Sequence, residues 1–245
     1  MKNISISIVS HGHGFMINQV LKDFDNLGLT NYEILLTINI KEDLNFLNSF
    51  QHLPIVLIQN KSPKGFGRNH NEAFAIAKGA IFIVSNPDIR IKKFDPEHIL
   101  SLFESNNPEN KGIVSPLIFN LSGEFDEFSR PFPTFISLFS RFFLKKIKRA
   151  NRSINNIGVV DWVPGVFMIF KKDTFLKVDG FDTRYHMYME DVDICRAVQR
   201  INLSVFVDFN ISVVHTAMRQ SNVNFKHFLW HFTSAIKYFI KHLFL

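Results

Sequence analysis

The sequence predicts an α/β fold with a mostly parallel central sheet flanked by helices. Short β-branched runs alternate with amphipathic helical patterns through the first half of the chain, and this alternation is typical of βαβ units. Polar or glycine-rich residues follow several of the expected strands. The chain has 245 residues, of which 46% are hydrophobic, so it can form one such domain with a substantial core.

The expected elements follow one another in a regular order. Strands are predicted where β-branched residues gather in short runs, and helices where apolar residues recur every three or four positions. In the first half these elements are a strand at 4–9, a helix at 16–27, strands at 32–38 and 55–58, a helix at 69–78 and a strand at 80–84. Regular structure is expected to resume at Val159, with strands at 166–170 and 212–214 and a helix that begins near Glu190.

The charge balance of the chain is modest. It carries 28 Lys and Arg and 22 Asp and Glu, which gives a net charge of +6. This excess favours a phosphate-bearing ligand or an anionic membrane surface, and it is too small to indicate nucleic acid. The single cysteine, Cys195, excludes an internal disulfide, and we expect it to be a small buried side chain in a protein of a reducing compartment.

The N-terminus and the apolar runs bear on the compartment. The chain begins directly with a strand-like run and shows no pattern of an export signal. No uninterrupted apolar run approaches the roughly 18 to 20 residues that a membrane span requires. We therefore expect a cytoplasmic protein that is either soluble or bound to the inner face of the cytoplasmic membrane.

Three acids open the expected helix, Glu190 being the first of them. Asp191 shares a helical stripe with three apolar residues, so its carboxylate is expected to point inward. A carboxylate in the first turn is stabilised by the N–H groups there and by the helix dipole, and it can accept a proton from a bound molecule. Asp193 falls on the face of Arg196 and Arg200, and we interpret it as a structural ion-pair partner.

Polar and glycine-rich segments follow three of the expected strands. Ligands of such sheets bind beyond the strand ends, so these segments are candidates for binding. In the longest segment, glycines let the backbone approach a ligand, an arginine can grip phosphate and asparagines can cap a helix, which suits the diphosphate or the sugar of a nucleotide. The alternative is an ordinary helix entry with a solvated arginine. The candidate residues are Ser10, His11, Asn39, Gly65, Gly67, Arg68, Asn69 and Asn71.

Asn86-Pro87-Asp88 places one carboxylate at the end of another apolar strand. This carboxylate is either a ligand for Mg²⁺ or Mn²⁺, which bind one or two carboxylates together with substrate phosphates, or part of an ordinary turn. His215 ends a later strand-like run and is either a metal ligand or a hydrogen-bonded structural residue.

Trp162 and Gly165 precede the buried strand expected at 166–170. An aromatic face stacks well on a sugar, and glycine permits close approach, so this pair is a candidate for binding an acceptor. The alternative is that the segment belongs to the hydrophobic core.

Two stretches, 135–149 and 225–245, combine an apolar helical stripe with basic residues. Such stripes are typical of helices that lie on a membrane surface. The alternatives are packing on the sheet and formation of a homodimer, because amphipathicity alone does not distinguish them. The apolar positions are Phe135, Leu138, Phe139, Phe142 and Phe143 in the first stretch, and Phe225, Phe228, Leu229, Phe232, Ile236, Phe239, Ile240 and Leu243 in the second.

With these residues in view, the chain resembles the family-2 glycosyltransferases, especially the rhamnosyltransferase-like members that build bacterial surface polysaccharides such as O-antigen or capsule. The resemblance covers residues 3–221, and its motifs are specific as an ordered set. They are the opening strand at 4–9, the segment 65–71, Asn86-Pro87-Asp88, the segment 162–168, Gly180-Phe181-Asp182 with 188–193, and the segment 215–221.

The resemblance implies a GT-A fold, a nucleotide-sugar donor and a divalent metal, Mg²⁺ or Mn²⁺. It implies that Asp191 is the general base, that Glu190 is its neighbour in an acidic pair, and that Asp88 and His215 hold the metal. Asn86 stands where many relatives have a second acid. The donor is then linked to dTDP or UDP, with rhamnose as the family-level sugar, and the acceptor is a saccharide or a lipid-linked molecule.

The sequence thus predicts an inverting, metal-dependent hexosyltransferase with a domain at 1–221. The nucleotide-sugar half is expected at about 1–120, the acceptor half at about 121–221, and an amphipathic helix at 222–245. Ser10-His11-Gly12 and Ile38-Asn39 depart from the Thr-Tyr-Asn and Asp-Asn of many relatives. Two alternatives stay open: a sugar nucleotidyltransferase, which would release pyrophosphate, and a sugar- or partner-binding module without catalysis.

Overall fold

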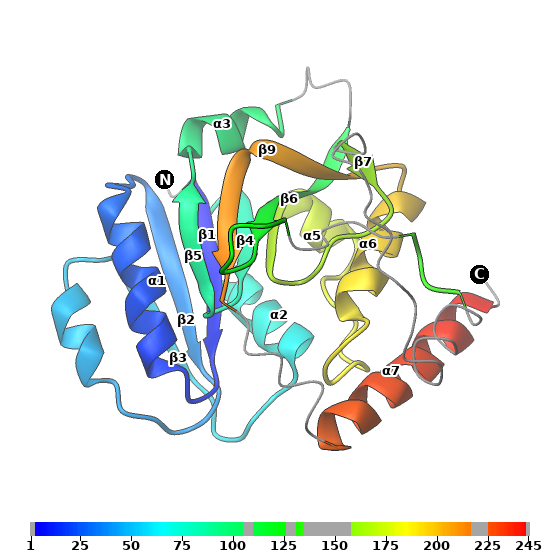
Figure 1. Cartoon of the computed structure of the whole chain (residues 1–245), viewed down its shortest axis with the longest axis horizontal. Helices are drawn as coiled ribbons and strands as arrows, with labels where there is room; N and C mark the ends of the chain where they lie inside the picture. The colour runs from blue at the N-terminus through cyan, green and yellow to red at the C-terminus, as the bar shows by residue number, and fades with distance from the viewer. Residues whose placement is uncertain (1–2, 105–109, 126–130, 135–157, 217–224, 244–245) are drawn as a thin grey trace.

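One sheet of nine strands runs through the chain, of which the computed structural model describes residues 3–104, 110–125, 131–134, 158–216 and 225–243 (Figure 1). In chain order the strands are β1 (Ile4–Ser10), β2 (Tyr32–Ile38), β3 (Ile55–Gln59), β4 (Ile81–Ser85), β5 (Ile89–Lys93), β6 (Lys111–Phe119), β7 (Val159–Val160), β8 (Phe167–Lys171) and β9 (Ser204–His215). Across the sheet they follow the order β3-β2-β1-β4-β8-β6-β9-β5, and β7 pairs with β9.

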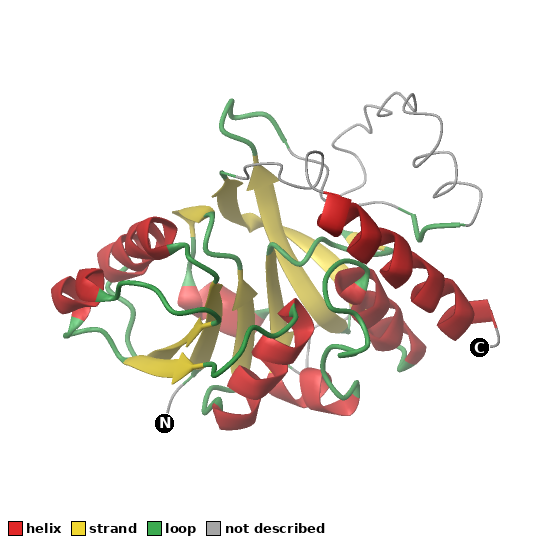
Figure 2. Ribbon diagram, turned by 90° about the horizontal axis from the view of Figure 1, so that it is seen from below, coloured by secondary structure: helices red, strands yellow, loops and turns green. Residues whose placement is uncertain are grey.

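Helices cover both faces of this sheet, which confirms the predicted α/β class (Figures 1 and 2). In chain order they are α1 (Gly14–Asn26), the 3₁₀ helix η1 (Asn45–Phe50), α2 (Phe66–Ile76), α3 (Pro96–Ser101), α5 (Lys172–Lys177), α6 (Glu190–Arg200) and α7 (Phe225–Leu243). The C-terminal helix α7, red in Figure 1, lies along the outer side of α6, on the side away from the sheet.

The first four strands in the order are parallel, as the βαβ pattern predicts. β1 lies between β2 and β4, with Ile6 opposite Ile34 on one side and Ile83 on the other. β3 adds to the outer edge of β2. The carboxyl ends of these strands therefore meet at one rim of the sheet.

The rest of the sheet is mixed, so the expected mostly parallel order holds for the first half only. β8 is antiparallel to both β4 and β6, and β9 is parallel to β6 but antiparallel to β5. Three residues, Asn86-Pro87-Asp88, separate β4 from β5. Parallel neighbours need a crossover of a dozen or more residues, so β5 cannot lie parallel beside β4, and it is found paired with β9.

The two faces of the sheet are buried in two separate hydrophobic cores. Along β2, Ile34 and Leu36 face the core that α1 covers, whereas Leu35 faces the core that α2 and α6 cover. Burial on both faces explains why the strands are nearly continuous apolar runs. Cys195 belongs to the second core, where burial raises the pKa of its thiol, so the prediction of a small buried side chain is confirmed.

Most predicted boundaries agree with the structure to within a few residues, but the strand predicted at 212–214 is the end of the longer β9, which begins at Ser204. The predicted start of α2 is also shifted. This helix begins at Phe66, because Gly65 is extended and serves as its N-cap. The Asn69 N–H already donates to the Gly65 carbonyl at 3.1 Å within the helix. The expectation that an asparagine caps this helix is therefore wrong. The predicted stretch 135–149 lies outside the described residues.

Candidate active site

Amide side chains converge where β1, β2 and β3 end. The Asn39 side-chain carbonyl accepts hydrogen bonds from the Lys64 backbone N–H at 2.8 Å and from the Asn60 amide at 2.9 Å. The Asn39 amide donates to the Lys64 carbonyl at 3.0 Å. Asn60 also donates to the Asn69 side chain at 2.7 Å. This network ties the loop after β3 to the end of β2, so two of the predicted binding segments share one rim.

The loop after β1 lies against this network. The Asn39 amide is 3.0 Å from the His11 Nδ1 atom. Ser10 is buried, and its hydroxyl accepts the His13 N–H at 3.1 Å. Gly12 has a φ of +77°, a left-handed conformation that glycine adopts readily. Ser10 therefore holds the turn, and His11 is the exposed side chain at the rim.

Asp88 and His215 meet at the ends of two paired strands. Because Ile89 of β5 lies opposite His215 of β9, the preceding Asp88 carboxylate reaches the imidazole, with Oδ2 at 3.2 Å from Nε2. Burial opposes ionisation of Asp88, but the hydrogen bond and the charge of His215 outweigh it and lower the pKa of the carboxyl. The other oxygen, Oδ1, is buried and has no hydrogen-bond partner in the described part of the chain.

These two residues can supply part of a metal site. Within residues 3–104, 110–125, 131–134, 158–216 and 225–243, no group of three or more His, Cys, Asp and Glu side chains is arranged to hold a metal ion. Divalent cations in phosphate-binding sites, however, often take only one or two protein carboxylates and complete their shell with phosphate oxygens and water. The unpartnered oxygen of Asp88 beside the imidazole of His215 fits such a partial site.

The predicted acidic pair opens α6 after a strained turn. Tyr188 and Met189 have φ values of +71° and +69°, which residues other than glycine rarely adopt. Glu190 and Asp191 then form the first helical turn. Asp191 is half-buried, and its Oδ2 atom accepts the Gly165 N–H at 3.1 Å. The carboxylate thus turns toward the protein, as predicted.

Glu190 is the more buried acid of the pair, with 7% of its surface exposed. Its Oε2 atom has no hydrogen-bond partner among the residues that the structure describes. Burial, and after it the negative charge of Asp191, raises the pKa of Glu190 well above its usual range. Neighbouring carboxyl groups whose environments differ in this way can hold different protonation states at neutral pH.

Two glycines bring the start of α2 against the residues that precede the acidic pair, which we call the acid-pair loop (180–189). A Cβ on Gly65 would lie 2.5 Å from the His186 carbonyl oxygen, and one on Gly67 would lie 2.6 Å from the Phe181 Cβ. The Phe66 N–H donates to the same His186 carbonyl at 3.1 Å. Close packing within the chain therefore requires glycine at both positions.

Asn71 holds the acid-pair loop at its other end. Its side-chain amide donates to the Phe181 carbonyl at 2.8 Å and its side-chain oxygen accepts the Phe181 N–H at 2.9 Å. Arg68, by contrast, is mostly exposed and its Nε lies 3.2 Å from a carboxylate oxygen of Glu72. The two residues of the predicted phosphate-binding segment thus differ, because the Asn71 side chain is hydrogen-bonded to the backbone of Phe181 whereas Arg68 faces solvent.

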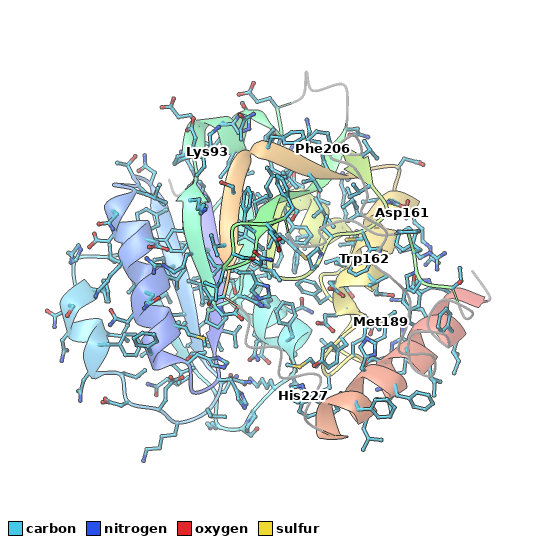
Figure 3. All side chains as sticks on the ribbon, viewed as in Figure 1. Lys93, Asp161, Trp162, Met189, Phe206 and His227 are labelled. Atoms are coloured by element: carbon cyan, nitrogen blue, oxygen red, sulfur yellow. The ribbon has the colours of Figure 1, made fainter. Side chains whose placement is uncertain are left out.

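Gly165 and Trp162 lie on the segment that leads into β8. A Cβ on Gly165 would lie 3.3 Å from the Phe66 ring and 3.5 Å from the Asp191 Cβ, so Gly165 sits between α2 and α6. The Trp162 indole N–H donates to the Pro131 carbonyl at 3.1 Å, and its ring packs against the cluster that contains Met189 (Figure 3).

The same segment links the acidic pair to the candidate metal motif. The Gly165 N–H donates to Asp191, and the carbonyl of the next residue, Val166, accepts the Asn86 N–H at 2.9 Å. Asn86 stands two residues before Asp88. Two motifs that are far apart in the sequence are thereby joined through two consecutive residues.

Asp193 forms an ion pair, as predicted, but with different partners. It is buried, and its two oxygens lie 2.7 Å from the Lys241 Nζ and 2.8 Å from the His242 Nε2. Arg196 instead donates to the Tyr238 hydroxyl at 3.1 Å. The expected pairing with Arg196 and Arg200 is wrong because Asp193 faces α7, which helical spacing within α6 does not reveal.

The sequence prediction missed several residues around the site. Asn60 and Lys64 belong to the amide network, and their place directly after a strand was the signal that could have found them. Lys241 contacts both Asp193 and Asp182, and no local pattern indicates this contact.

Curated relatives of the chain are rhamnosyltransferases. Rhamnosyltransferase WbbL of Escherichia coli (strain K12) is 29% identical over 246 residues, which cover 96% of this chain and 92% of the relative. The N-acetylglucosaminyl-diphospho-decaprenol L-rhamnosyltransferase of Mycobacterium tuberculosis (strain ATCC 25618 / H37Rv) is 29% identical over 136 residues, which cover 51% of this chain and 43% of the relative. No protein-family model matches the chain.

Solved glycosyltransferase structures share the architecture. Mannosyltransferase PcManGT from Pyrobaculum calidifontis, in complex with GDP-Man and Mn²⁺, has a TM-score of 0.66 at 14% identity, covering 96% of this chain and 64% of its own. GalNAc-T7 with UDP, GalNAc and Mn²⁺ has a TM-score of 0.63 at 13% identity, covering 89% and 44%. The chain has a GT-A fold. It spans less than two thirds of the length of each of these two neighbours.

These findings confirm the predicted resemblance to rhamnosyltransferase-like glycosyltransferases and the predicted fold. The roles of the individual site residues stay predictions. None of the helices in the described segments combines the length and the hydropathy needed to cross a bilayer.

Proposed function

We propose that this protein is an inverting, metal-dependent glycosyltransferase that transfers a sugar from a nucleoside-diphosphate sugar in the synthesis of a cell-surface polysaccharide. One observation carries the proposal. The Gly165 N–H donates to the Asp191 carboxylate, and the carbonyl of the adjacent Val166 accepts the Asn86 N–H of the metal motif. The candidate base and the candidate metal motif are therefore both hydrogen-bonded to these two consecutive residues. The named relatives and the shared fold support the same reaction class.

Asp191 is the proposed base. The N–H groups of Gly165 and Val192, at 3.1 and 2.9 Å, and the N-terminus of α6 favour its ionised form. In the reaction it takes the proton of the acceptor hydroxyl while that oxygen forms a bond to the anomeric carbon. The bond from this carbon to the diphosphate oxygen breaks, and the diphosphate leaves with the electron pair. Attack from the face opposite the leaving group inverts the anomeric centre.

Glu190 is proposed to remain protonated beside the ionised Asp191. Its burial and the neighbouring charge both raise its pKa, which favours the protonated form of Glu190. A carboxyl group that keeps its proton cannot accept another, so the environments of the two acids favour different roles. This arrangement assigns proton acceptance to Asp191 alone.

The donor is proposed to bind along the rim formed by the loops after β1, β2 and β3. Asp88 and His215 would hold a Mg²⁺ or Mn²⁺ ion, which supplies positive charge to the departing diphosphate. Arg68 is exposed at the start of α2, where a guanidinium can reach a phosphate. The remaining proposed donor contacts are Ser10, His11, Asn39, Gly65, Gly67, Asn69, Asn71 and Asn86.

We propose a dTDP- or UDP-linked sugar, with rhamnose as the leading candidate because both named relatives are rhamnosyltransferases. The acceptor is proposed to be a saccharide or a lipid-linked molecule, placed by Trp162 and Gly165. The enzyme would then work in the cytoplasm, at the inner face of the membrane. In this division, residues 1–120 bind the donor and residues 121–221 bind the acceptor.

The first experiment is a thermal-shift panel of nucleoside diphosphates and nucleotide sugars, with and without Mg²⁺ or Mn²⁺. A ligand that binds the folded state raises the melting temperature without any knowledge of the acceptor. A metal-dependent shift with one nucleotide is expected and would name the donor class. Folded protein that shifts with none of them would contradict the proposal and favour a binding module. Release of pyrophosphate rather than a nucleoside diphosphate would favour a nucleotidyltransferase.

A further inference from the structure

The helix α7 has an inner face that is held to the domain by polar contacts. The Ser234 hydroxyl donates to the Met187 carbonyl at 2.9 Å, and Tyr238 is fully buried and accepts a hydrogen bond from Arg196. Lys241 and His242 both pair with the buried Asp193. These contacts fix which side of the helix faces the protein.

The opposite side of α7 carries large apolar side chains. The exposed fractions are 43% for Leu229, 40% for Phe232, 44% for Ile236 and 59% for Ile240, and these residues follow the i, i+3, i+7, i+11 spacing of a single stripe. We call these four residues the outer stripe. An amphipathic helix in a globular protein usually buries such a stripe, whereas α7 leaves this one exposed and buries Ala235 and Tyr238 on its other face.

Charge is distributed unevenly along the sequence. Residues 129–160 and 209–245 together carry eleven Lys and Arg and no Asp or Glu. The rest of the chain carries 17 Lys and Arg and 22 Asp and Glu, so it is acidic on balance. An apolar stripe within an acid-free, basic stretch is complementary to a surface that is apolar inside and negatively charged outside.

We infer that α7 docks on an anionic lipid bilayer through its outer stripe. The inner contacts make this orientation stable, because turning the stripe inward would break the contacts with Lys241 and His242 and leave the Asp193 carboxylate buried without these two partners. Lys237, an exposed residue on the flank of α7, can contact lipid headgroups.

Docking through α7 would also bring the acidic pair toward the lipid surface. Besides Ser234, His227 contacts the acid-pair loop, its Nδ1 lying 2.8 Å from the Tyr188 hydroxyl (Figure 3). The same loop ends at Glu190 and Asp191. One helix therefore borders both the lipid surface and the proposed base, which suits an acceptor attached to lipid. Only this last step rests on the proposed function.

The test is flotation of the full chain with phosphatidylcholine vesicles, with or without phosphatidylglycerol. The docking variant is Ile236→Ser together with Ile240→Ser, which removes two exposed side chains of the outer stripe. Ile and Ser have similar helix propensities, so α7 should persist. The matched control is Leu121→Ser together with Leu176→Ser, which removes two side chains that are 76% and 67% exposed elsewhere.

Wild type and the control should float with the anionic vesicles, and the docking variant should lose about tenfold or more of this binding. Docking-variant binding equal to wild type, or no wild-type binding, would overturn the inference. Sedimentation of the same proteins provides the other outcome: a wild-type dimer that the docking variant dissociates would assign the stripe to self-association. None of these measurements needs donor or acceptor, so the nucleotide thermal shift of the same samples tests the proposed function separately.

Discussion

The backbone N–H of Gly165 donates to the Asp191 carboxylate at 3.1 Å, and a side chain at Gly165 would meet the Asp191 Cβ at 3.5 Å. The position is also bounded by Phe66 at the start of α2. Gly165 is therefore the point at which the segment entering β8, the start of α2 and the acidic pair touch. The orientation of Asp191 depends on a backbone group, which most substitutions at the surface leave in place.

Asp191→Asn should abolish most transfer while the fold is retained. The amide oxygen can still accept the Gly165 N–H, but the side chain can no longer accept the acceptor's proton. Loss of a general base typically lowers the rate by about 10² to 10⁴. The measurement is kcat with saturating donor and acceptor, and the nucleotide thermal shift should be unchanged. Asp179→Asn is the control, because Asp179 is exposed and has a φ of +59°, which Asn tolerates. Full activity of Asp191→Asn would refute the assignment.

Asp88→Asn should remove the metal-dependent part of donor binding. At a nucleotide concentration of about 100 Kd, binding stabilises the folded state by about 2.7 kcal/mol. Part of this stabilisation is expected to require Mg²⁺ or Mn²⁺. Most of that metal-dependent part should disappear in the variant, because the carboxylate charge is lost and an amide is a weaker ligand. The measurement is the melting temperature with nucleotide, with metal and with both. Asp173→Asn, a change at an exposed acid in α5, should behave as wild type; if Asp88→Asn did so too, the metal would not bind at Asp88.

Glu190→Gln, which replaces one carboxyl group of the acidic pair by an uncharged amide, should stabilise the protein at neutral pH. The raised pKa of Glu190 means that the folded state binds its proton more tightly than the unfolded state does. Stability in wild type therefore falls as pH rises above the ordinary Glu pKa of 4.5, and the amide removes this loss. We expect the advantage to be largest near pH 7 and to shrink toward pH 4. Urea unfolding at several pH values measures it, and a constant difference across pH would contradict the prediction.

Lys241→Met should loosen α7 and weaken the protein most at neutral pH. Burial opposes ionisation of Asp182, but hydrogen bonds from Arg184 and Lys241 outweigh it and lower the pKa of this carboxyl. A lowered carboxyl pKa contributes stability that is present above the ordinary Asp value of 3.8 and is lost as pH falls through the folded-state value. The cost of the variant should therefore be about 2 kcal/mol at pH 7 and smaller in acid.

The control for this change is Lys237→Met. Lys237 is exposed, and its Nζ donates to the Arg184 carbonyl at 2.8 Å rather than to a carboxylate, so its replacement should cost less than about 0.5 kcal/mol. Equal effects of the two variants on unfolding would mean that the pairs with Asp182 and Asp193 add little to the attachment of α7.

Local patterns in the sequence predicted the parallel half of the sheet well. Ile34, Leu35 and Leu36 form a continuous apolar run because β2 is buried on both faces, and a run of this kind is visible without any structure. The acidic start of α6 was also visible, because helix spacing relates Asp191 to its own neighbours. The order of the strands beyond β4 could not be predicted, since strand pairing across β8, β6 and β9 is decided by contacts between distant segments.

The same limit applies to the site. Asp193 lies next to two arginines in its own helix, yet it pairs with Lys241 and His242 of α7. The stripe on α7 was visible as a pattern, but its exposure depends on which face the inner contacts hold. Gly65 and Gly67 suggested an approaching ligand, and the group that approaches them is the backbone and the Phe181 side chain of the chain itself. The spacing of residues in the sequence identifies which face of a helix a side chain occupies, or where a small residue leaves space. The residue that contacts this face or fills this space belongs to another segment, which the spacing does not reveal.

The contact between Gly65 and the His186 carbonyl limits how the sequence can diverge. No side chain can enter between these backbones, because even a methyl group would come within 2.5 Å of the oxygen. A descendant that gained a side chain at position 65 would also need a change in the path of the acid-pair loop. The loop after β3 and the acid-pair loop are thus expected to be inherited as one unit, and exchanging only one of them between relatives would yield proteins that fold poorly or transfer slowly.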